Sequence, residues 1–273
     1  MKLGAMIYLS DKTTDGELFK PLMDYGLPTC QLAAYQEEQF TDKFIEDVKK
    51  SQNRYGIQIT ALWSFWYPPA VWDFYEGPST LGLVPQAFRF ARLQFLKQAA
   101  TFAGKLGIRD FITHVGFIPE NPNDPEYTSL IPVLRDLVNH CEKHNQNFLF
   151  ETGQETPITL RRVIEDINLK NVGINLDPAN LLLYGKANPI DALDIIGEYV
   201  KGVHAKDGEY PTNPRSLGEE KKLGEGRVNF PGLIKKLKEI GYEGAITIER
   251  EISGEQQVKD IIEAKNYLLG LIE

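Results

Sequence analysis

Strand-like and helix-like segments alternate eight times along these 273 residues, and this alternation restricts the chain to few folds. Apolar residues with a period of two predict the strands, and apolar residues at helical spacing predict the helices. Repeated strand–helix–strand units favour parallel strands joined by crossover helices. Eight units in roughly 250 residues match an α/β fold, the (β/α)8 TIM barrel. A doubly wound open sheet is the alternative, but no glycine-rich phosphate turn follows the first strand.

The boundaries of the segments come from the same patterns and from helix-ending glycines. The predicted strands are 3–9, 27–33, 57–63, 108–115, 147–151, 172–177, 200–204 and 244–249. The predicted helices are 16–25, 41–55, 87–106, 127–144, 157–167, 189–197, 230–240 and 255–271. Two long loops remain, an aromatic one at 64–86 and a second at 207–229. No linker or change of composition divides the chain, so we expect one domain over residues 1–273.

The composition is that of an acidic soluble protein. A net charge of −8 argues against a nucleic-acid surface, which needs a basic face. No apolar run approaches the ~20 residues of a membrane span, and the first residues do not resemble a signal peptide. Cys30 and Cys141 form neither a disulfide framework nor a metal-type spacing. We therefore expect a cytoplasmic protein that binds neither nucleic acid nor membrane.

Charged or ionisable side chains stand at the carboxyl ends of the last four predicted strands. Glu151, Asp177, His204 and Glu249 each end their own strand. All strands of a TIM barrel run in one direction, so their carboxyl ends surround one mouth. Residues at equivalent depth on neighbouring strands would lie within reach of one ion. The register of these four residues is therefore the main sequence evidence for a functional site.

The chemistry of this set favours a hard divalent cation. Three carboxylates and one neutral imidazole suit Mn²⁺, Mg²⁺ or Co²⁺, with Zn²⁺ as a further candidate. Each residue alone has an ordinary structural explanation; Asp177, which precedes Pro178, can simply cap a turn. A set of four on successive strands is less readily explained by structure alone.

Other polar and aromatic residues are candidates for the same mouth. His114 ends the fourth predicted strand, and Lys206 shares the face of His204 by the period of two, so both are candidates for substrate contact. Trp63 and the aromatic loop after it can form an apolar wall that excludes water. His140 and His144, one helical turn apart, fall on an outer helix, where a solvated face is expected. The Gly224–Gly226 segment favours a simple turn over a phosphate contact.

Five short motifs carry a family resemblance. They are Phe-Glu-Thr at 150–152, Asn-Leu-Asp-Pro-Ala-Asn at 175–180, Val-His-Ala-Lys-Asp at 203–207, Gly-Glu-Gly-Arg-Val-Asn-Phe at 224–230 and Thr-Ile-Glu-Arg-Glu at 247–251. With these motifs the chain resembles, over nearly its whole length, the sugar-phosphate isomerase/epimerase family of the xylose-isomerase-like TIM barrels. The resemblance implies one divalent ion held by Glu151, Asp177, His204 and Glu249.

The resemblance also implies a reaction. In the ketose 3-epimerases of this superfamily the two metal-bound glutamates work as an acid/base pair, which here would be Glu151 and Glu249. One removes a proton from the carbon beside a carbonyl, and the other returns a proton to the resulting cis-enediolate. The implied activity is that of a metal-dependent isomerase or epimerase acting on a small keto-sugar or sugar derivative. By the same analogy a homo-oligomer is expected.

The chain departs from those epimerases at two substrate-holding positions. A histidine is expected three residues after the metal aspartate and an arginine six after the metal histidine. Asn180 and Tyr210 stand there instead, so Asn180 is a candidate for substrate contact. A metal-dependent lyase of the inosose-dehydratase type is therefore an alternative. A non-catalytic sugar-binding barrel is the alternative from a different class.

Overall fold

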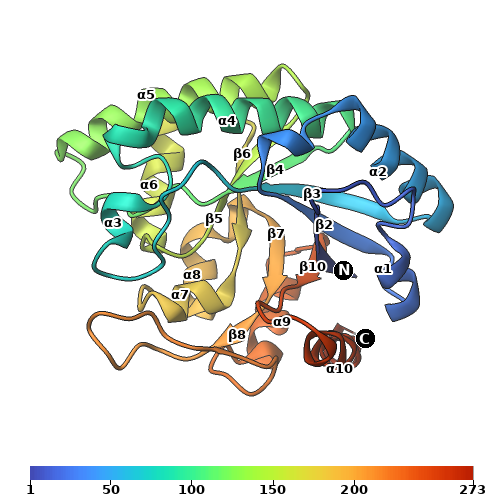
Figure 1. The fold of residues 1–273 in the computed structure, drawn as a ribbon. Coiled ribbons are helices and arrows are strands. Elements are labelled where there is room, and N and C mark those ends of the chain that lie inside the picture. The colour runs from blue at the N-terminus through green and yellow to red at the C-terminus, as the bar shows by residue number, and fades with distance from the viewer. Residues whose placement is uncertain (273) are drawn as a thin grey trace.

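The computed structural model describes residues 1–272, and within them eight parallel strands close into a barrel (Figure 1). These strands are β1 (Lys2–Tyr8), β2 (Thr29–Ala34), β3 (Gln58–Ser64), β4 (Asp110–Thr113), β5 (Asn147–Glu151), β6 (Val172–Leu176), β7 (Val200–Ala205) and β10 (Ala245–Ile248). Each strand pairs with its neighbour in sequence order, and β10 closes the barrel against β1. The predicted TIM barrel is confirmed.

Helices connect the strands and form the outer layer. They are α1 (Lys20–Tyr25), α2 (Asp42–Tyr55), α3 (Gly77–Thr80), α4 (Gln86–Lys105), α5 (Pro125–Glu142), α6 (Pro157–Ile167), α7 (Pro178–Leu183), α8 (Pro189–Ile196), α9 (Phe230–Glu239) and α10 (Glu255–Ile272), with 3-10 turns at Glu37–Gln39 and Gly197–Tyr199. Figure 1 shows α4 and α5 packed side by side at one edge of the molecule, with α10 at the opposite edge.

Local sequence explains where the helices start and stop. The Thr41 side chain accepts a hydrogen bond from the Phe44 backbone N–H and so caps α2. Gly56 ends the same helix in the left-handed conformation, as predicted. Thr156 caps α6 in the same way, and Asn168 ends it with a positive φ. The eight main helices were predicted from such signals and lie within four residues of the expected boundaries.

The barrel interior is apolar on one side and polar on the other. A buried cluster contributed by strands β1 to β5 fills the first side; it consists of Met6, Ala33, Ala61, Trp63, Ile112 and Leu149. On the other side β6, β7 and β10 place Asn175, His204 and Thr247 in the interior, where all three are fully buried. Buried polar side chains need partners, so this half of the barrel is where a site is expected.

Four short elements, two helices and two strands, were not predicted. Helix α3 lies inside the aromatic loop, and two-residue strands β8 (Asp207–Gly208) and β9 (Glu220–Lys221) pair antiparallel within the second loop. Helix α7 follows β6 directly, and every one of its residues is buried. A helix buried all round shows no apolar–polar periodicity, so the pattern that revealed the other helices was missing here.

Two expectations from the composition concern membrane-spanning helices and the two cysteines. No helix among residues 1–272 combines the length and the hydropathy that crossing a bilayer requires. Cys30 and Cys141 are both buried free thiols.

A buried arginine holds the aromatic loop after β3. Arg92 of α4 is fully buried. Its guanidinium donates hydrogen bonds to the carbonyl oxygens of Tyr67, Pro69 and Gly82 at 2.6–2.9 Å. It also lies 5.7 Å from the ring centre of Trp66. One cation thus satisfies three buried carbonyls, and this fixes the path of the loop.

Replacing Arg92 with methionine is expected to lower the free energy of unfolding by about 3 kcal/mol or more. The reason is that each buried carbonyl left without a donor costs about 1–3 kcal/mol. Urea denaturation followed by tryptophan fluorescence measures the change. Arg54→Met, at an exposed arginine of α2, is the matched control and should stay within about 0.5 kcal/mol of the wild type. Equal stability of the two variants would contradict the role assigned to Arg92.

Candidate metal centre

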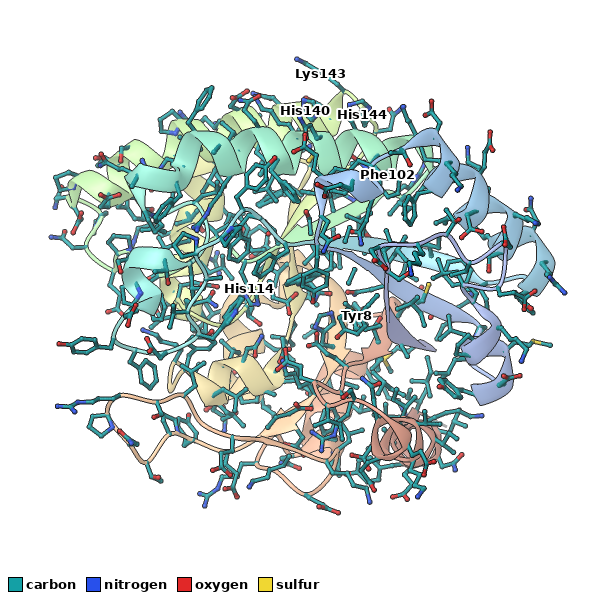
Figure 2. The ribbon with its side chains drawn as sticks, in the orientation of Figure 1. Tyr8, Phe102, His114, His140, Lys143 and His144 are labelled. Atoms are coloured by element: carbon teal, nitrogen blue, oxygen red, sulfur yellow. The ribbon has the colours of Figure 1, made fainter. Side chains whose placement is uncertain are left out.

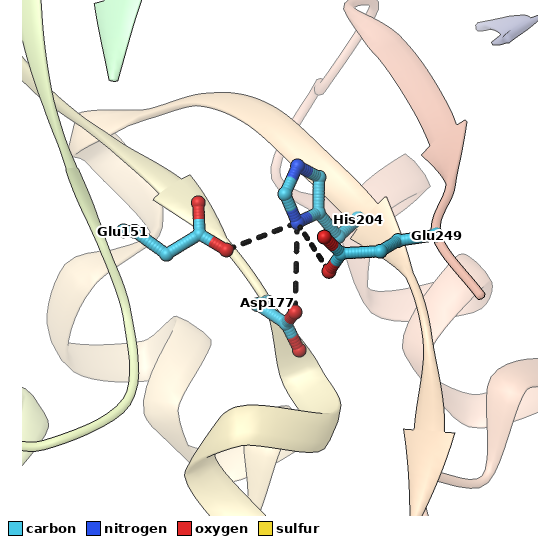
Figure 3. A group of neighbouring side chains, drawn as sticks. All are labelled: Glu151, Asp177, His204 and Glu249. Atoms are coloured by element: carbon cyan, nitrogen blue, oxygen red, sulfur yellow. Dashed lines mark ion pairs between the residues drawn. The ribbon is translucent and has the colours of Figure 1, made fainter. Parts of the chain in front are cut away.

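The four strand-end residues converge at one end of the barrel. Glu151, Asp177, His204 and Glu249 each offer a ligand atom, and these atoms all lie within 4.8 Å of one another (Figure 3). All four residues are at most 8% exposed. Within residues 1–272 no other group of three or more His, Cys, Asp or Glu side chains meets in this way. The four side chains therefore lie together at the mouth of the barrel, as their positions at the strand ends predicted.

The geometry around His204 fits a cation. Its Nδ1 lies 3.0 Å from Glu151 Oε1, 3.5 Å from Asp177 Oδ2 and 3.2 Å from Glu249 Oε2 (Figure 3). Both His204 Nδ1 and Asp177 Oδ2 are buried, and neither has a hydrogen-bond partner among the described residues. Unpaired buried polar atoms are costly, and three carboxylates gathered in a low-dielectric site repel one another. A divalent cation among these oxygens and the imidazole nitrogen would relieve both costs.

Asp177 combines a structural role with its place in this cluster. Its Oδ1 accepts a hydrogen bond from the Asn180 backbone N–H at 2.8 Å and so caps α7, while Oδ2 faces His204. Thr152 clamps the backbone of the same residue: its Oγ1 donates to Asp177 O and accepts from Asp177 N, both at 2.8 Å. The expected turn-capping role is therefore present, and it orients the second carboxylate oxygen toward the cluster.

The two glutamates sit in different electrostatic surroundings. Burial raises the pKa of Glu151 to about 7, although His204 works in the opposite direction. Burial would also raise the pKa of Glu249, but Lys206 and His204 outweigh it and hold that pKa well below its usual range. The difference arises because Lys206 Nζ lies 3.2 Å from Glu249 Oε2. Glu249 is thus the more strongly ionised member of the pair.

A cavity of about 300 Å³ opens beside the cluster. Its walls are formed by Tyr35, Trp63, Phe65, Trp72, His114, Glu151, Asn180, Leu183, Tyr184, Lys206, Leu217, Glu249 and Glu251. All four candidates for substrate contact, Trp63, His114, Asn180 and Lys206, border this cavity. Their predicted contact with substrate stays a prediction, but each is in a position to make it. A concave, largely aromatic cavity with a few polar groups is the usual form of a small-molecule site.

Sequence reasoning missed one charged residue of the cavity. Glu251 lies 3.0 Å from Lys206 Nζ through its Oε1, so the buried ammonium is shared between Glu249 and Glu251. The signal for Glu251 was available, because it follows Glu249 by two residues on the same face of the chain. Burial would lower the pKa of Lys206, but these two carboxylates raise it well above its usual value. Lys206 is therefore protonated at physiological pH and places a positive charge at the cavity wall.

Fewer aromatic residues line the cavity than the composition of the loop indicated. Trp63 and Trp72 line the cavity, and both rings approach His114, at 6.1 and 5.3 Å between ring centres. Trp66 instead is almost fully buried and stacks on Phe65. Burial lowers the pKa of His114 to about 3, so this imidazole is neutral at physiological pH. It can exchange hydrogen bonds with a ligand but carries no charge.

The two remaining candidate histidines, His140 and His144, lie away from the cavity. Figure 2 shows His114 inside the molecule and His140 and His144 at its outer edge on the α5 side. The rings of His140 and His144 both approach the Thr101 hydroxyl, at 3.0 and 3.3 Å. The pair lies away from the mouth as predicted, but the expected solvated face is wrong, because both rings are half-buried against α4.

The Gly224–Gly226 segment serves the loop itself. The backbone N–H groups of Gly224 and Gly226 donate to Asp207 Oδ2 at 3.0 and 3.1 Å, and that of Val228 donates to Asp207 Oδ1 at 3.0 Å. A Cβ on Gly226 would lie 2.2 Å from Asp207 Oδ1, so only glycine fits there. The segment is therefore a turn around the buried Asp207 side chain, as predicted, and its backbone N–H groups are used within the loop.

Glu155 is a further buried carboxyl group, outside the four candidate ligands. It allows a test of how the stability of the fold depends on pH. Burial raises the pKa of Glu155 to about 8, and its Oε1 has no hydrogen-bond partner among the described residues. The folded protein therefore keeps this proton while the unfolded chain loses it above pH 4.5. The contribution of Glu155 to stability is fully present below about pH 4.5 and is lost as the pH rises to about 8.

Glu155→Gln is expected to remove this loss. At pH 8 the variant should exceed the wild type by up to several kcal/mol in the free energy of unfolding, at about 1.4 kcal/mol per unit of pKa shift. At pH 4.5 the difference should be small. Urea denaturation at both pH values measures it, with the exposed Glu243→Gln as the control. A pH-independent difference would show that Glu155 is ionised in the folded state.

Comparison with known proteins agrees with the fold. The family model described as xylose isomerase-like TIM barrel matches residues 19–269. A xylose isomerase domain protein from Planctomyces limnophilus is 35% identical, with a TM-score of 0.91, over 99% of this chain and 98% of that chain. An uncharacterized protein of Methanocaldococcus jannaschii is 24% identical over 100% of this chain and 90% of its own length. A D-tagatose 3-epimerase-like protein is 23% identical, with a TM-score of 0.75, over 100% of this chain and 97% of that chain. The chain belongs to the xylose isomerase-like TIM barrel family.

Proposed function

We propose that this protein is a divalent-metal-dependent isomerase or epimerase of a keto-sugar or sugar derivative. The observation that carries the proposal is the convergence of Glu151, Asp177, His204 and Glu249 beside an aromatic-walled cavity. Two carboxylates of this set also face the cavity, where they can exchange protons with a bound substrate. Metal ligands, acid/base groups and an apolar wall together suit proton transfer beside a carbonyl.

Several structural neighbours support this class of reaction. Structures that share the fold include a D-psicose 3-epimerase, 15% identical with a TM-score of 0.72, and a 3-keto-D-glucoside 4-epimerase from E. coli, 17% identical with a TM-score of 0.71. A xylose isomerase-like TIM barrel protein from Mycobacterium smegmatis, 17% identical, was solved in complex with magnesium. These proteins share the fold at low identity, so they support the class of reaction and leave the substrate of this chain open.

The surroundings of the two glutamates favour an order of proton transfer. Glu249, held ionised beside Lys206, is the better group to take a proton from the carbon next to the carbonyl. Glu151, the other carboxylate of the set that borders the cavity, is then the group that returns one. Return to the opposite face of the same carbon gives an epimer, and return to the neighbouring carbon gives an isomer. A bound divalent ion would supply Lewis-acid stabilisation of the negative charge that develops on the substrate oxygens.

The cavity walls suit a sugar. The rings of Trp63, Phe65 and Trp72 offer apolar faces to the C–H groups of a sugar and keep water from the reacting carbon. Asn180, Lys206 and the neutral His114 are placed to hydrogen-bond hydroxyl groups. In this arrangement the aromatic wall orients the ring, and the polar residues select the position of its hydroxyls.

A dehydratase is the second candidate, and Lys206 is the observation that favours it. A buried ammonium at the cavity wall can donate a proton to a departing hydroxyl, which elimination of water requires. A probable 3-DHS dehydratase from Bacillus anthracis, 14% identical with a TM-score of 0.68, shares the fold. Loss of water from the substrate, with no isomer formed, would place the protein in this class.

Metal analysis followed by isotope exchange tests the proposal. The purified protein is expected to bind one divalent ion per chain, and Glu151→Ala should lose it. His140→Ala, at the outer histidine pair, is the control and should keep it. The metal-loaded protein, incubated in D₂O with a panel of keto-sugars, should place deuterium on a carbon beside the carbonyl. Absence of both metal and exchange would refute the proposal, and metal without exchange would favour a sugar-binding barrel.

A further inference from the structure

Two buried amide side chains link His204 to Glu151 beneath the proposed metal site. His204 Nε2 lies 2.7 Å from Gln31 Oε1, Gln31 Nε2 lies 2.9 Å from Asn175 Oδ1, and Asn175 Nδ2 lies 2.8 Å from Glu151 Oε2. Gln31 comes from β2, and the other three residues come from β7, β6 and β5. The four residues are at most 2% exposed. The chain of amides therefore joins two of the four candidate ligands without reaching solvent.

The direction of the hydrogen bonds in this chain is set at the Glu151 end. An ionised Glu151 carboxylate only accepts, so the Asn175 amide nitrogen must face it and donate. The Asn175 oxygen then accepts from Gln31, and the Gln31 oxygen accepts from His204 Nε2–H. Reversing either amide would set two oxygens or two N–H groups against each other. The proton on Nε2 leaves the Nδ1 lone pair of a neutral His204 free for a cation.

The barrel wall makes room for this arrangement. A Cβ built on Gly202 of β7 would lie 2.3 Å from Asn175 Oδ1, so only glycine allows the amide to occupy its place. The backbone conformation of Gly202 does not itself require glycine, because its φ is not among the positive values in the chain. The close approach to Asn175 is therefore the reason for glycine here.

We propose that Gln31 and Asn175 are positioning residues that prepare His204 and Glu151 for a divalent cation. Gln31 holds the imidazole with its proton on Nε2, and Asn175 holds one Glu151 oxygen so that the other faces Nδ1. The inference rests on the metal site proposed above. Outer partners of this kind typically change metal affinity 10–100-fold when they are removed. Neither residue touches the cavity, so their effect on substrate is indirect.

Gln31→Met tests the proposal, because methionine keeps the length of the side chain and removes both hydrogen bonds. We expect its Kd for Mn²⁺, measured by isothermal titration, to be about 10–100-fold weaker than that of the wild type. In ¹⁵N-histidine spectra of the Mg²⁺-loaded protein, the His204 Nε2–H signal should lose the downfield shift and the slow exchange that the short bond to Gln31 confers. Gln31→Glu, which restores an acceptor for Nε2–H, should recover that signal.

Gln146→Met is the matched control. Gln146 is equally buried, but it donates to the Ile108 carbonyl away from the site, so this variant should keep the wild-type Kd. An unchanged Kd and His204 signal in Gln31→Met would overturn the proposal and leave Gln31 as a packing residue. If Gln31→Met does not fold, Asn175→Ala takes its place, with the same loss of affinity expected and an unchanged Kd again overturning it. If the wild type binds neither Mn²⁺ nor Mg²⁺, the metal site itself is refuted.

Discussion

Replacing Glu249 with glutamine is expected to reduce deuterium exchange into a keto-sugar by about 10³-fold or more, while the fold is retained. An amide cannot take up the proton, and a general base typically contributes about 10²–10⁴-fold. The environment of Glu249 adds to the effect, because Lys206 holds this carboxylate in its ionised form. Glutamine has nearly the same shape, and residue 249 lies at the edge of the cavity, so little packing is lost. Exchange in D₂O and circular dichroism measure the two outcomes.

Loss of the base must be separated from loss of a ligand. The variant is therefore assayed at saturating Mn²⁺, with its metal content determined in the same sample. Glu239→Gln, at an exposed glutamate of α9, is the control and should exchange deuterium at the wild-type rate. Metal-loaded Glu249→Gln with undiminished exchange would remove Glu249 from the chemistry.

The affinity for a divalent ion is expected to weaken at least tenfold for each pH unit below about 7. In the metal-free protein burial raises the pKa of Glu151 to about 7. Burial would lower the pKa of His204, but Glu151 and Glu249 outweigh it and raise that pKa well above its usual value. The cation must displace the protons from the atoms it binds, so it competes with them more successfully as the pH rises.

Isothermal titration with Mn²⁺ at pH 6, 7 and 8 measures this dependence. Repeating each titration in two buffers of different ionisation enthalpy counts the protons released, and we expect one or more per ion. His140→Ala should reproduce the wild-type profile, because that histidine lies at the outer edge of the molecule. An affinity that is constant from pH 6 to 8, with no proton release, would place the ion at a different site.

The main features of the fold and the four converging residues could be predicted because they depend on local periodicity. Strand and helix periods differ, and eight alternations leave few topologies. In a barrel every strand points the same way, so a residue at the end of its strand is carried to the mouth whatever the other contacts are. Glu151, Asp177, His204 and Glu249 could be found for this reason. The four lie within 4.8 Å of one another, although the pairing of β6 with β7 shifts by one residue between Ile174 and Asn175.

The partners of these residues could not be predicted, because they depend on which strands face each other across the barrel. Gln31 precedes His204 by 173 residues and lies 2.7 Å from it only because the barrel closes. Helix α7 was missed because burial on all sides leaves no periodicity to detect. The sequence alone thus determined the barrel and the set of candidate ligands, through the strand and helix periods. Only the tertiary structure decided which of the two glutamates has the raised pKa and which carboxylates pair with Lys206. It also decided which amide side chains hold His204. All of these depend on distances between segments far apart in the chain.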